Sequence, residues 1–247
     1  MVKTLTPLRF STAQEGAFHR ALQRRAYGYL HARGDHRFAN RRAISKAVLI
    51  LLAAIVCYSL ALRASQPLAF MAGYVAFAVL MMWLNIDVNH DASHHTFVRS
   101  RVLNAVISRA VTLSTGIEPV YWRVRHVSFH HRYANIERYD LDTEENGIFR
   151  QTPFQRWRGW MRWQHVYWPL VAALSLSWIG VVFDWADRLG RTPLRAERLL
   201  PGAAGWAAFI FSKLGHLTLM LGLPLMMGHD GALVLGLYLL VQMCTSL

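Results

Sequence analysis

The chain has 247 residues, 54% of them hydrophobic, and a formal net charge of +13 with the histidines neutral. Its apolar residues gather in runs that are too long and too poor in charge for an ordinary soluble domain. Runs of about 20 residues match the hydrocarbon thickness of a bilayer. Cys57 and Cys244 lie in different apolar runs, which argues against a disulfide framework or an iron–sulfur site. The composition therefore predicts an all-α, multi-pass membrane protein.

The first 43 residues are polar and basic, and we expect them to form a cytoplasmic arm. A basic helix from about Ala13 to Ala32 is predicted to lie on the membrane surface. No apolar core followed by a small-residue cleavage site is visible, so we expect no cleavable signal peptide. Residues 44–247 are expected to form the membrane domain.

Four apolar segments predict about four transmembrane helices: Ile44–Leu62, Pro67–Ile86, Trp206–Met227 and Ala232–Leu247. A further segment, 166–185, is apolar enough to span but has basic residues on both sides. For this segment we favour a re-entrant or half-inserted helix pair over a true crossing. The second predicted helix runs directly into His90, so its end should carry that histidine to the membrane surface.

Arginines are concentrated in three stretches outside the predicted spans: Arg20–Lys46, Arg99–Arg162 and Arg188–Arg198. In a soluble protein a pI of about 10.5 would favour nucleic-acid binding. Here the positive-inside rule accounts for the charge and places these stretches on the cytoplasmic face. We therefore expect membrane lipids as neighbours and no nucleic-acid partner. The composition, rich in Ala and Arg, points to a bacterial plasma membrane.

The chain contains the pattern His-x-x-x-His-His twice. The first box is His90, His94 and His95, and the second box is His126, His130 and His131. In an α-helix, positions i and i+4 share a face. His90 should then point with His94, and His126 with His130. The last histidine of each box would reach sideways toward a second metal or stay out of the site.

Clustered imidazoles beside membrane-length segments suggest a transition-metal site, and such a metal suggests redox chemistry. A haem-binding subunit with paired axial histidines is an alternative from a different class, although adjacent His-His doublets argue against it. The remaining candidates, His165, His216 and His229, are isolated. We interpret His165 as part of an interfacial aromatic belt and His216 as a hydrogen-bonded packing residue. His229 should lie on the opposite side of the membrane.

Several motifs together resemble the membrane-bound fatty acid desaturases, in particular the acyl-lipid and front-end branch. They are His-Asp-Ala-Ser-His at 90–94, Trp-x-x-x-His-x-x-x-His-His-x-x-x-Asn-Ile at 122–136, Asp-x-Asp at 140–142 and Trp-Gln-His-Val-Tyr-x-Pro at 163–169. The resemblance covers about residues 40–247 and is specific at the boxes. It implies a four-helix membrane protein that holds two irons at the cytosolic face. Such enzymes insert a double bond into a fatty acyl chain with dioxygen and two external electrons.

The resemblance also implies roles for individual residues. All six box histidines are candidate iron ligands, and neutral imidazoles suit iron that changes oxidation state. Four polar residues could hold ring N–H groups of these ligands: Asp91, Asn135, Asp140 and Asp142. The substrate would be a fatty acyl lipid or an acyl thioester. A related di-iron hydroxylase or ketolase, acting on alkyl chains or carotenoids, remains an alternative.

Two features of the family are missing. Nothing after His131 matches the third box, Gln/His-x-x-His-His, so we expect a C-terminally truncated form of a longer enzyme. The His-Pro-Gly-Gly signature of a fused cytochrome b5 domain is also absent. Electrons are therefore expected from a separate carrier, such as an acidic ferredoxin or a cytochrome that docks on the basic face.

Overall fold

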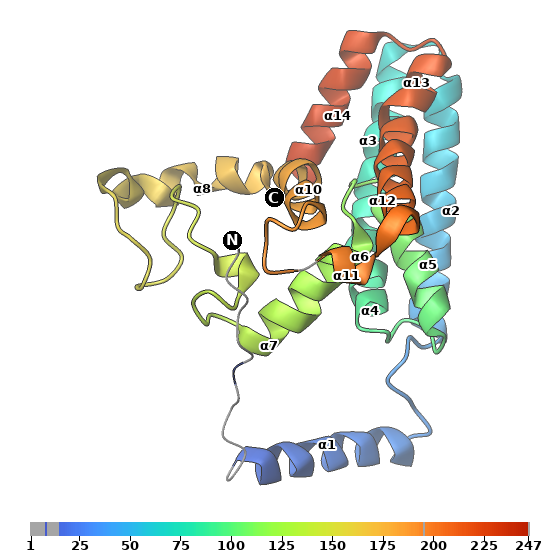
Figure 1. Ribbon diagram of the computed structural model, residues 1–247. Helices are drawn as coiled ribbons and strands as arrows, with labels where there is room; N and C mark the ends of the chain where they lie inside the picture. Colours follow the sequence, from blue (N-terminus) through green and yellow to red (C-terminus); the bar gives the residue numbers. More distant parts are fainter. Residues whose placement is uncertain (1–7, 9–14, 195, 247) are drawn as a thin grey trace.

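A computed structural model of the chain describes Leu8, residues 15–194 and residues 196–246. This part of the chain is helical and contains no strand, which confirms the all-α prediction. Three helices are long and apolar enough to cross a membrane: Arg41–Arg63, Pro67–Ser93 and Gly202–Met226. They form an upright bundle in Figure 1. Large apolar side chains such as Leu49 and Leu60, 67% and 64% exposed, face outward from it, as expected for a surface that contacts lipid.

The first two spans form a tight helical hairpin. Helix α2 (Arg41–Arg63) begins where the Asn40 side chain accepts a hydrogen bond from the backbone N–H of Ala43, at 2.9 Å. Helix α3 (Pro67–Leu84) begins with proline, whose missing N–H costs nothing in a first turn. The two helices approach closely at Gly73, where a Cβ atom would lie 2.9 Å from Cβ of Ala61. A small residue is therefore required at this crossing.

The third span packs on this hairpin. It consists of α12 (Gly202–Leu217), the π-helix η6 (Thr218–Gly222) and α13 (Leu223–Met226). The hydroxyl of Tyr74 donates to the carbonyl of Met220 at 2.8 Å, and Tyr58 donates to the carbonyl of Leu219. These carbonyls belong to the π-helix, whose hydrogen-bond register differs from that of an α-helix. The tyrosines thus satisfy backbone groups that lie away from water.

The last helix, α14 (Gly231–Ser246), is apolar but shorter than the other spans. It corresponds to the fourth predicted span; Leu247 lies outside the described residues. Figure 1 shows α14 leaning away from α2 and α3, with its C-terminal end near α10. A turn with the sequence Gly-His-Asp-Gly at 228–231 leads into it, and Gly228 in this turn has a φ of +88°.

The segment between the second box and α12 is broken into short helices. These are η3 (Leu141–Thr143), η4 (Gly159–Trp163), α8 (Gln164–Ala173), α9 (Ser175–Trp178), η5 (Ile179–Phe183), α10 (Asp184–Arg188) and α11 (Ala196–Leu199). The pair Gly159–Ala173 and Ser175–Arg188 bends by 58°. A bend of this size fits a broken span as well as the re-entrant pair predicted at 166–185.

Helix α1 (Glu15–Ala32) confirms the predicted basic helix, although its predicted start at Ala13 lies outside the described residues. Figure 1 shows α1 running across the direction of the bundle, beyond the end that carries α4. The segment between α1 and α2 is bound to the residues that follow the first box, where the backbone N–H of Ala39 donates to the carbonyls of Thr96 and Phe97, each at 3.2 Å.

Both histidine boxes lie at one end of the bundle. Helix α3 continues through the π-helix η1 (Asn85–Asn89) into α4 (His90–Ser93). After α5 (Arg101–Thr112), a second helical rod is formed by α6 (Pro119–Arg123), the π-helix η2 (Val124–His130) and α7 (His131–Tyr133). Nε of Arg123 donates to the carbonyl of Ser93 at 2.9 Å and joins the two rods.

Candidate metal centre

Four histidines from the two boxes converge on one point. The group consists of His90, His94, His126 and His131, and one ring nitrogen from each lies within 4.8 Å of the others. His90 begins α4 and His94 caps its C-terminal end, and the two point together as the sequence predicts for an i, i+4 pair. The second two come from the rod that starts at Pro119.

The second box does not follow the α-helical prediction. We expected His126 to point with His130, and their rings do lie nearly parallel with centroids 5.9 Å apart, but the partner of His126 in the group is His131. The reason is the π-helix η2, in which the backbone N–H of His131 bonds to the carbonyl of His126, one residue later than in an α-helix. Position i+5 thereby takes the place that i+4 would occupy.

The spacing of this pair suits a metal ion. Nε2 of His126 and Nε2 of His131 lie 3.0 Å apart. An imidazole nitrogen binds a divalent metal such as zinc at about 2.1 Å, so two ligands at a right angle would be separated by about 3.0 Å. Nε2 of His94 is buried and has no hydrogen-bond partner within the part of the chain that the structure describes. This donor set fits a metal.

The electrostatics of the group favour neutral imidazoles. Burial, followed by the neighbouring imidazoles of the group, lowers the pKa of His126 to about 4. Burial also lowers the pKa of His94. Both rings are then uncharged near neutral pH and present lone pairs to a cation, which is the state that metal ligation requires.

His130 is oriented by a buried carboxylate. Its Nδ1 lies 3.1 Å and 3.2 Å from the two oxygens of Asp140, whose side chain is fully buried. The same carboxylate accepts the backbone N–H of Asn135 at 2.8 Å and of Asp142 at 3.1 Å. A proton on Nδ1 satisfies the carboxylate and leaves Nε2 as the free nitrogen, as in carboxylate–histidine–metal arrangements.

The other predicted supporting residues lie near the boxes in different ways. Asn135 contributes its backbone, with a φ of +61° that asparagine tolerates better than most residues. Oδ2 of Asp142 lies 3.5 Å from Nδ1 of His130, and burial raises the pKa of this carboxyl. Oδ1 of Asp91 is 3.6 Å from Nδ1 of His90, which is too long for a hydrogen bond.

His95 stands apart from the group of four. It ends the first box with a φ of +56°, and its backbone N–H bonds to the carbonyl of Ala92. This left-handed turn directs the chain away from the direction of α4. Its Nδ1 is nevertheless buried without a hydrogen-bond partner among the described residues.

The isolated histidines lie elsewhere. His229 stacks on Phe70 with ring centroids 3.9 Å apart, and its Nε2 contacts the carbonyl of Leu62 at the far end of α2 from the boxes. His165 lies 6.3 Å from the ring of Trp163. His216 is buried and hydrogen-bonded through both nitrogens, as predicted for a packing residue.

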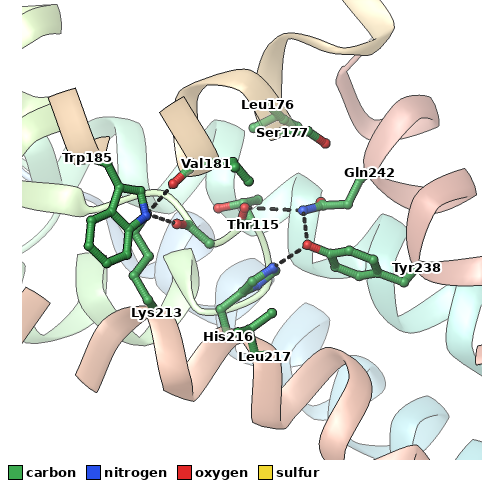
Figure 2. Close-up of a pocket in the computed structure, with 12 residues that line it drawn as sticks. Thr115, Leu176, Ser177, Val181, Trp185, Lys213, His216, Leu217, Tyr238 and Gln242 are labelled. Atoms are coloured by element: carbon green, nitrogen blue, oxygen red, sulfur yellow. Dashed lines mark hydrogen bonds between the residues drawn. The ribbon is translucent and has the colours of Figure 1, made fainter. Parts of the chain in front are cut away.

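A small apolar cavity of about 140 Å³ adjoins His216 (Figure 2). On one wall His216, Tyr238, Gln242 and the carbonyl of Thr115 form a hydrogen-bonded chain. On the opposite side Nζ of Lys213 donates to backbone carbonyls of Gly116 and Gly180. None of the six box histidines lines this cavity.

Sequence reasoning missed two of the side chains that support the second box, Trp122 and Arg125. The ring of Trp122 stacks on His126, with centroids 4.7 Å apart and an interplanar angle of 14°. Arg125, next to His126, forms a buried ion pair with Asp187. A Trp four residues before a His in a helix could have suggested the stacking. The ion pair joins positions 62 residues apart and carries no local signal.

Comparison with known proteins gives a consistent result. A family model described as fatty acid desaturase matches residues 65–247. The chain is 26% identical to the sn-1 linoleoyl-lipid 6-desaturase of Synechocystis sp., over 92% of this chain and 63% of that protein. It is 26% identical to the acyl-lipid (7-3)-desaturase of Diacronema lutheri, over 78% and 42% of the two chains. With the acyl-lipid (8-3)-desaturase of Physcomitrium patens it shares 24% identity, over 97% and 50%.

No solved structure matches the chain. The matched region spans 42% to 63% of the length of these curated relatives. The family model nevertheless covers most of the chain, including both boxes and all the supporting residues described above. This protein belongs to the fatty acid desaturase family.

Proposed function

We propose that this chain supplies two histidine boxes of a di-iron desaturase that acts on fatty acyl chains in a membrane. The observation that carries the proposal is the group of four imidazoles, drawn from both boxes, at one end of an apolar helical bundle. His90, His94, His126 and His131 would hold one iron. His130 and His95, the two remaining box histidines, are candidate ligands of a second iron.

The overall reaction converts –CH2–CH2– into –CH=CH–. One dioxygen, two electrons and two protons are consumed, and two waters are formed. Bound iron would supply the oxygen-dependent oxidation that an unactivated hydrocarbon needs and that amino-acid side chains cannot perform. The protein then needs no nucleophile, and its task is to hold ligands, position the chain and exclude water.

The residues of this chain account for part of that task. His126 stays neutral because its surroundings penalise the imidazolium. Asp140 keeps the proton of His130 on Nδ1 and presents Nε2. Trp122 covers one face of the His126 ring and so limits the access of water to it.

The proposed substrate is an acyl chain esterified in a lipid, because the curated relatives are named acyl-lipid or linoleoyl-lipid desaturases. An acyl thioester is the competing form of the substrate. The boxes would face the cytoplasm of a bacterium, since the basic stretches share their end of the bundle. A separate acidic electron carrier, a ferredoxin or a cytochrome, would dock there.

Product analysis tests the proposal. The complete reading frame that contains this chain is expressed in a bacterium without polyunsaturated lipids, and the fatty acids are analysed by mass spectrometry. We expect a new double bond that depends on oxygen and disappears in His126→Ala. The matched control, His229→Ala, removes a histidine at the far end of the bundle and should leave the product and the iron content unchanged. A hydroxylated or ketonic product would refute desaturation while retaining the metal centre.

A further inference from the structure

The short helix α10 is unusual because it buries three charged side chains. Asp184, Asp187 and Arg188 are at most 5% exposed, in a helix of five residues next to a membrane bundle. Burying a charge is costly unless it is paired. Asp184 and Asp187 form ion pairs with cations on other segments, and Arg188 donates to the backbone carbonyls of Leu200 and Gly202.

The Asp187 carboxylate is joined to the second box. Its Oδ2 accepts from Nε of Arg125 at 2.9 Å, and its Oδ1 accepts from Nη2 at 2.5 Å. The hydroxyl of Thr192 also donates to Oδ1, and the ring of Phe183 lies 4.8 Å from Cζ of Arg125. Two parallel hydrogen bonds fix the plane as well as the position of a guanidinium.

The pair acts at the place where the box is most sensitive to rotation. Arg125 lies within η2 and immediately precedes His126. A rotation of η2 about its axis would break both hydrogen bonds to Asp187. The same rotation would move His126 and His131 relative to the first box, whose His90 and His94 rings lie 5.0 Å and 5.4 Å from the ring of His126. Through its two hydrogen bonds to Arg125, Asp187 therefore fixes the orientation of the His126 and His131 imidazoles.

Stability alone does not explain such a pair. A buried ion pair is often no more stabilising than apolar residues of the same size, and its better-attested role is to specify one geometry. The neighbouring Asp184 is paired differently, with Nζ of Lys213 at 2.5 Å and with the backbone N–H of Glu118 at 2.7 Å. Asp184 is thus bound to the start of the rod that carries the second box, and Asp187 is bound to the middle of the same rod.

We propose that Arg125 and Asp187 are positioning residues of the metal centre, whose bidentate ion pair sets the geometry of His126 and His131. This inference rests on the proposed function, because it assumes that these histidines bind a metal. Neither residue belongs to the groups of possible ligands. The pair acts through the π-helix.

The test uses the purified, metal-free protein and Co²⁺ alone as a spectroscopic probe, so that no turnover is needed. Asp187→Asn should weaken Co²⁺ binding by up to about 10-fold, the lower end of the usual cost of removing a direct hydrogen-bond partner of a metal ligand, because Asp187 acts on the ligands through Arg125. It should also change the visible ligand-field spectrum. Arg125→Lys keeps the charge but loses the bidentate geometry, and it should shift the spectrum with a smaller loss of affinity. The double exchange Arg125→Asp with Asp187→Arg should recover part of the affinity lost in Asp187→Asn.

Glu118→Gln is the matched control. It breaks a second buried ion pair, in which Nη2 of Arg109 donates to Oε1 of Glu118 at 2.9 Å, at the start of the same rod. It should lower the unfolding temperature and leave the Co²⁺ spectrum unchanged. Wild-type affinity and spectrum in Asp187→Asn would overturn the positioning role, and so would an equal spectral change in Glu118→Gln. If Asp187→Asn does not fold, the spectrum of Arg125→Lys decides, and a wild-type spectrum overturns the proposal. Absence of Co²⁺ binding in the wild-type protein would instead refute the metal centre itself.

Discussion

Asparagine in place of Asp140 should weaken metal binding through His130 without removing any histidine. Asp140 is fully buried, and its two oxygens serve three groups: Nδ1 of His130 and the backbone N–H groups of Asn135 and Asp142. An asparagine has one oxygen and one NH2 group at these positions. In either orientation the NH2 faces a backbone N–H, because each carboxylate oxygen accepts one of them.

Two magnitudes follow from this geometry. Losing the carboxylate partner of a ligating histidine weakens metal binding by about 10–100-fold. That factor corresponds to about 1.4–2.7 kcal/mol. A buried backbone donor left without an acceptor costs about 1–3 kcal/mol in folding stability. Asp140→Asn should therefore lower both the affinity for metal and the unfolding temperature of the metal-free protein.

The assay separates the two effects. Co²⁺ affinity is measured by titration, and the unfolding temperature of the metal-free protein is measured under one scan rate for all variants. Asp142→Asn is the control, because its carboxylate is 47% exposed and lies 3.5 Å from Nδ1 of His130. It should change the affinity much less. If Asp140→Asn folds and binds Co²⁺ as tightly as the wild type, the proposed orientation of His130 by Asp140 is incorrect.

Three further predictions concern the group of four and the bundle. His131→Ala should reduce Co²⁺ binding more than His95→Ala, because only the former removes a nitrogen of the converging group; equal losses in the titration would argue against this arrangement. The metal-free protein should unfold at a lower temperature at pH 5 than at pH 7. The pKa of His126 is about 4 in the folded state, below its usual 6.5. Between these two pKa values the unfolded chain binds one more proton than the folded chain, so the free energy of unfolding decreases as the pH falls. His126→Ala should reduce that pH dependence, and an unchanged slope in thermal unfolding would contradict the assignment. Gly73→Ala places a Cβ 2.9 Å from neighbouring atoms and should lower the free energy of unfolding by about 1–3 kcal/mol. Gly236→Ala is the control, because its Cβ would meet nothing within 4 Å. Similar unfolding temperatures for the two variants would show that the α2–α3 contact relaxes freely.

The spans and the pairing of His90 with His94 could be predicted from the sequence because both depend on local patterns. Apolar length located α2 and α3, and the i, i+4 rule paired His90 with His94. The pairing of His126 with His131 could not be predicted in this way. A π-turn and an α-turn differ by one hydrogen bond, and tertiary contacts decide between them.

The side chains that support the centre could be predicted only in part. Asp140 follows its histidine closely in the chain, and the motif Asp-x-Asp marked it. Asp187 is 62 residues from Arg125, in a segment that reads as apolar. The predicted re-entrant pair anticipates a bend in this segment, but nothing local in the sequence indicates that Asp187 meets Arg125.

The π-turn at Val124–His130 has a consequence for how the length of this box can vary. If one residue between His126 and His130 were deleted and the turn closed as an α-turn, the last histidine would move from i+5 to i+4. It would then return to nearly the same face of the helix. A box with i, i+5 spacing in a π-turn and a box with i, i+4 spacing in an α-turn could therefore place their two ring nitrogens in the same positions. The direction of the two histidine side chains can therefore stay the same while the number of residues between them differs by one. Two such sites can be more similar in structure than the spacing of their histidines in the sequence indicates.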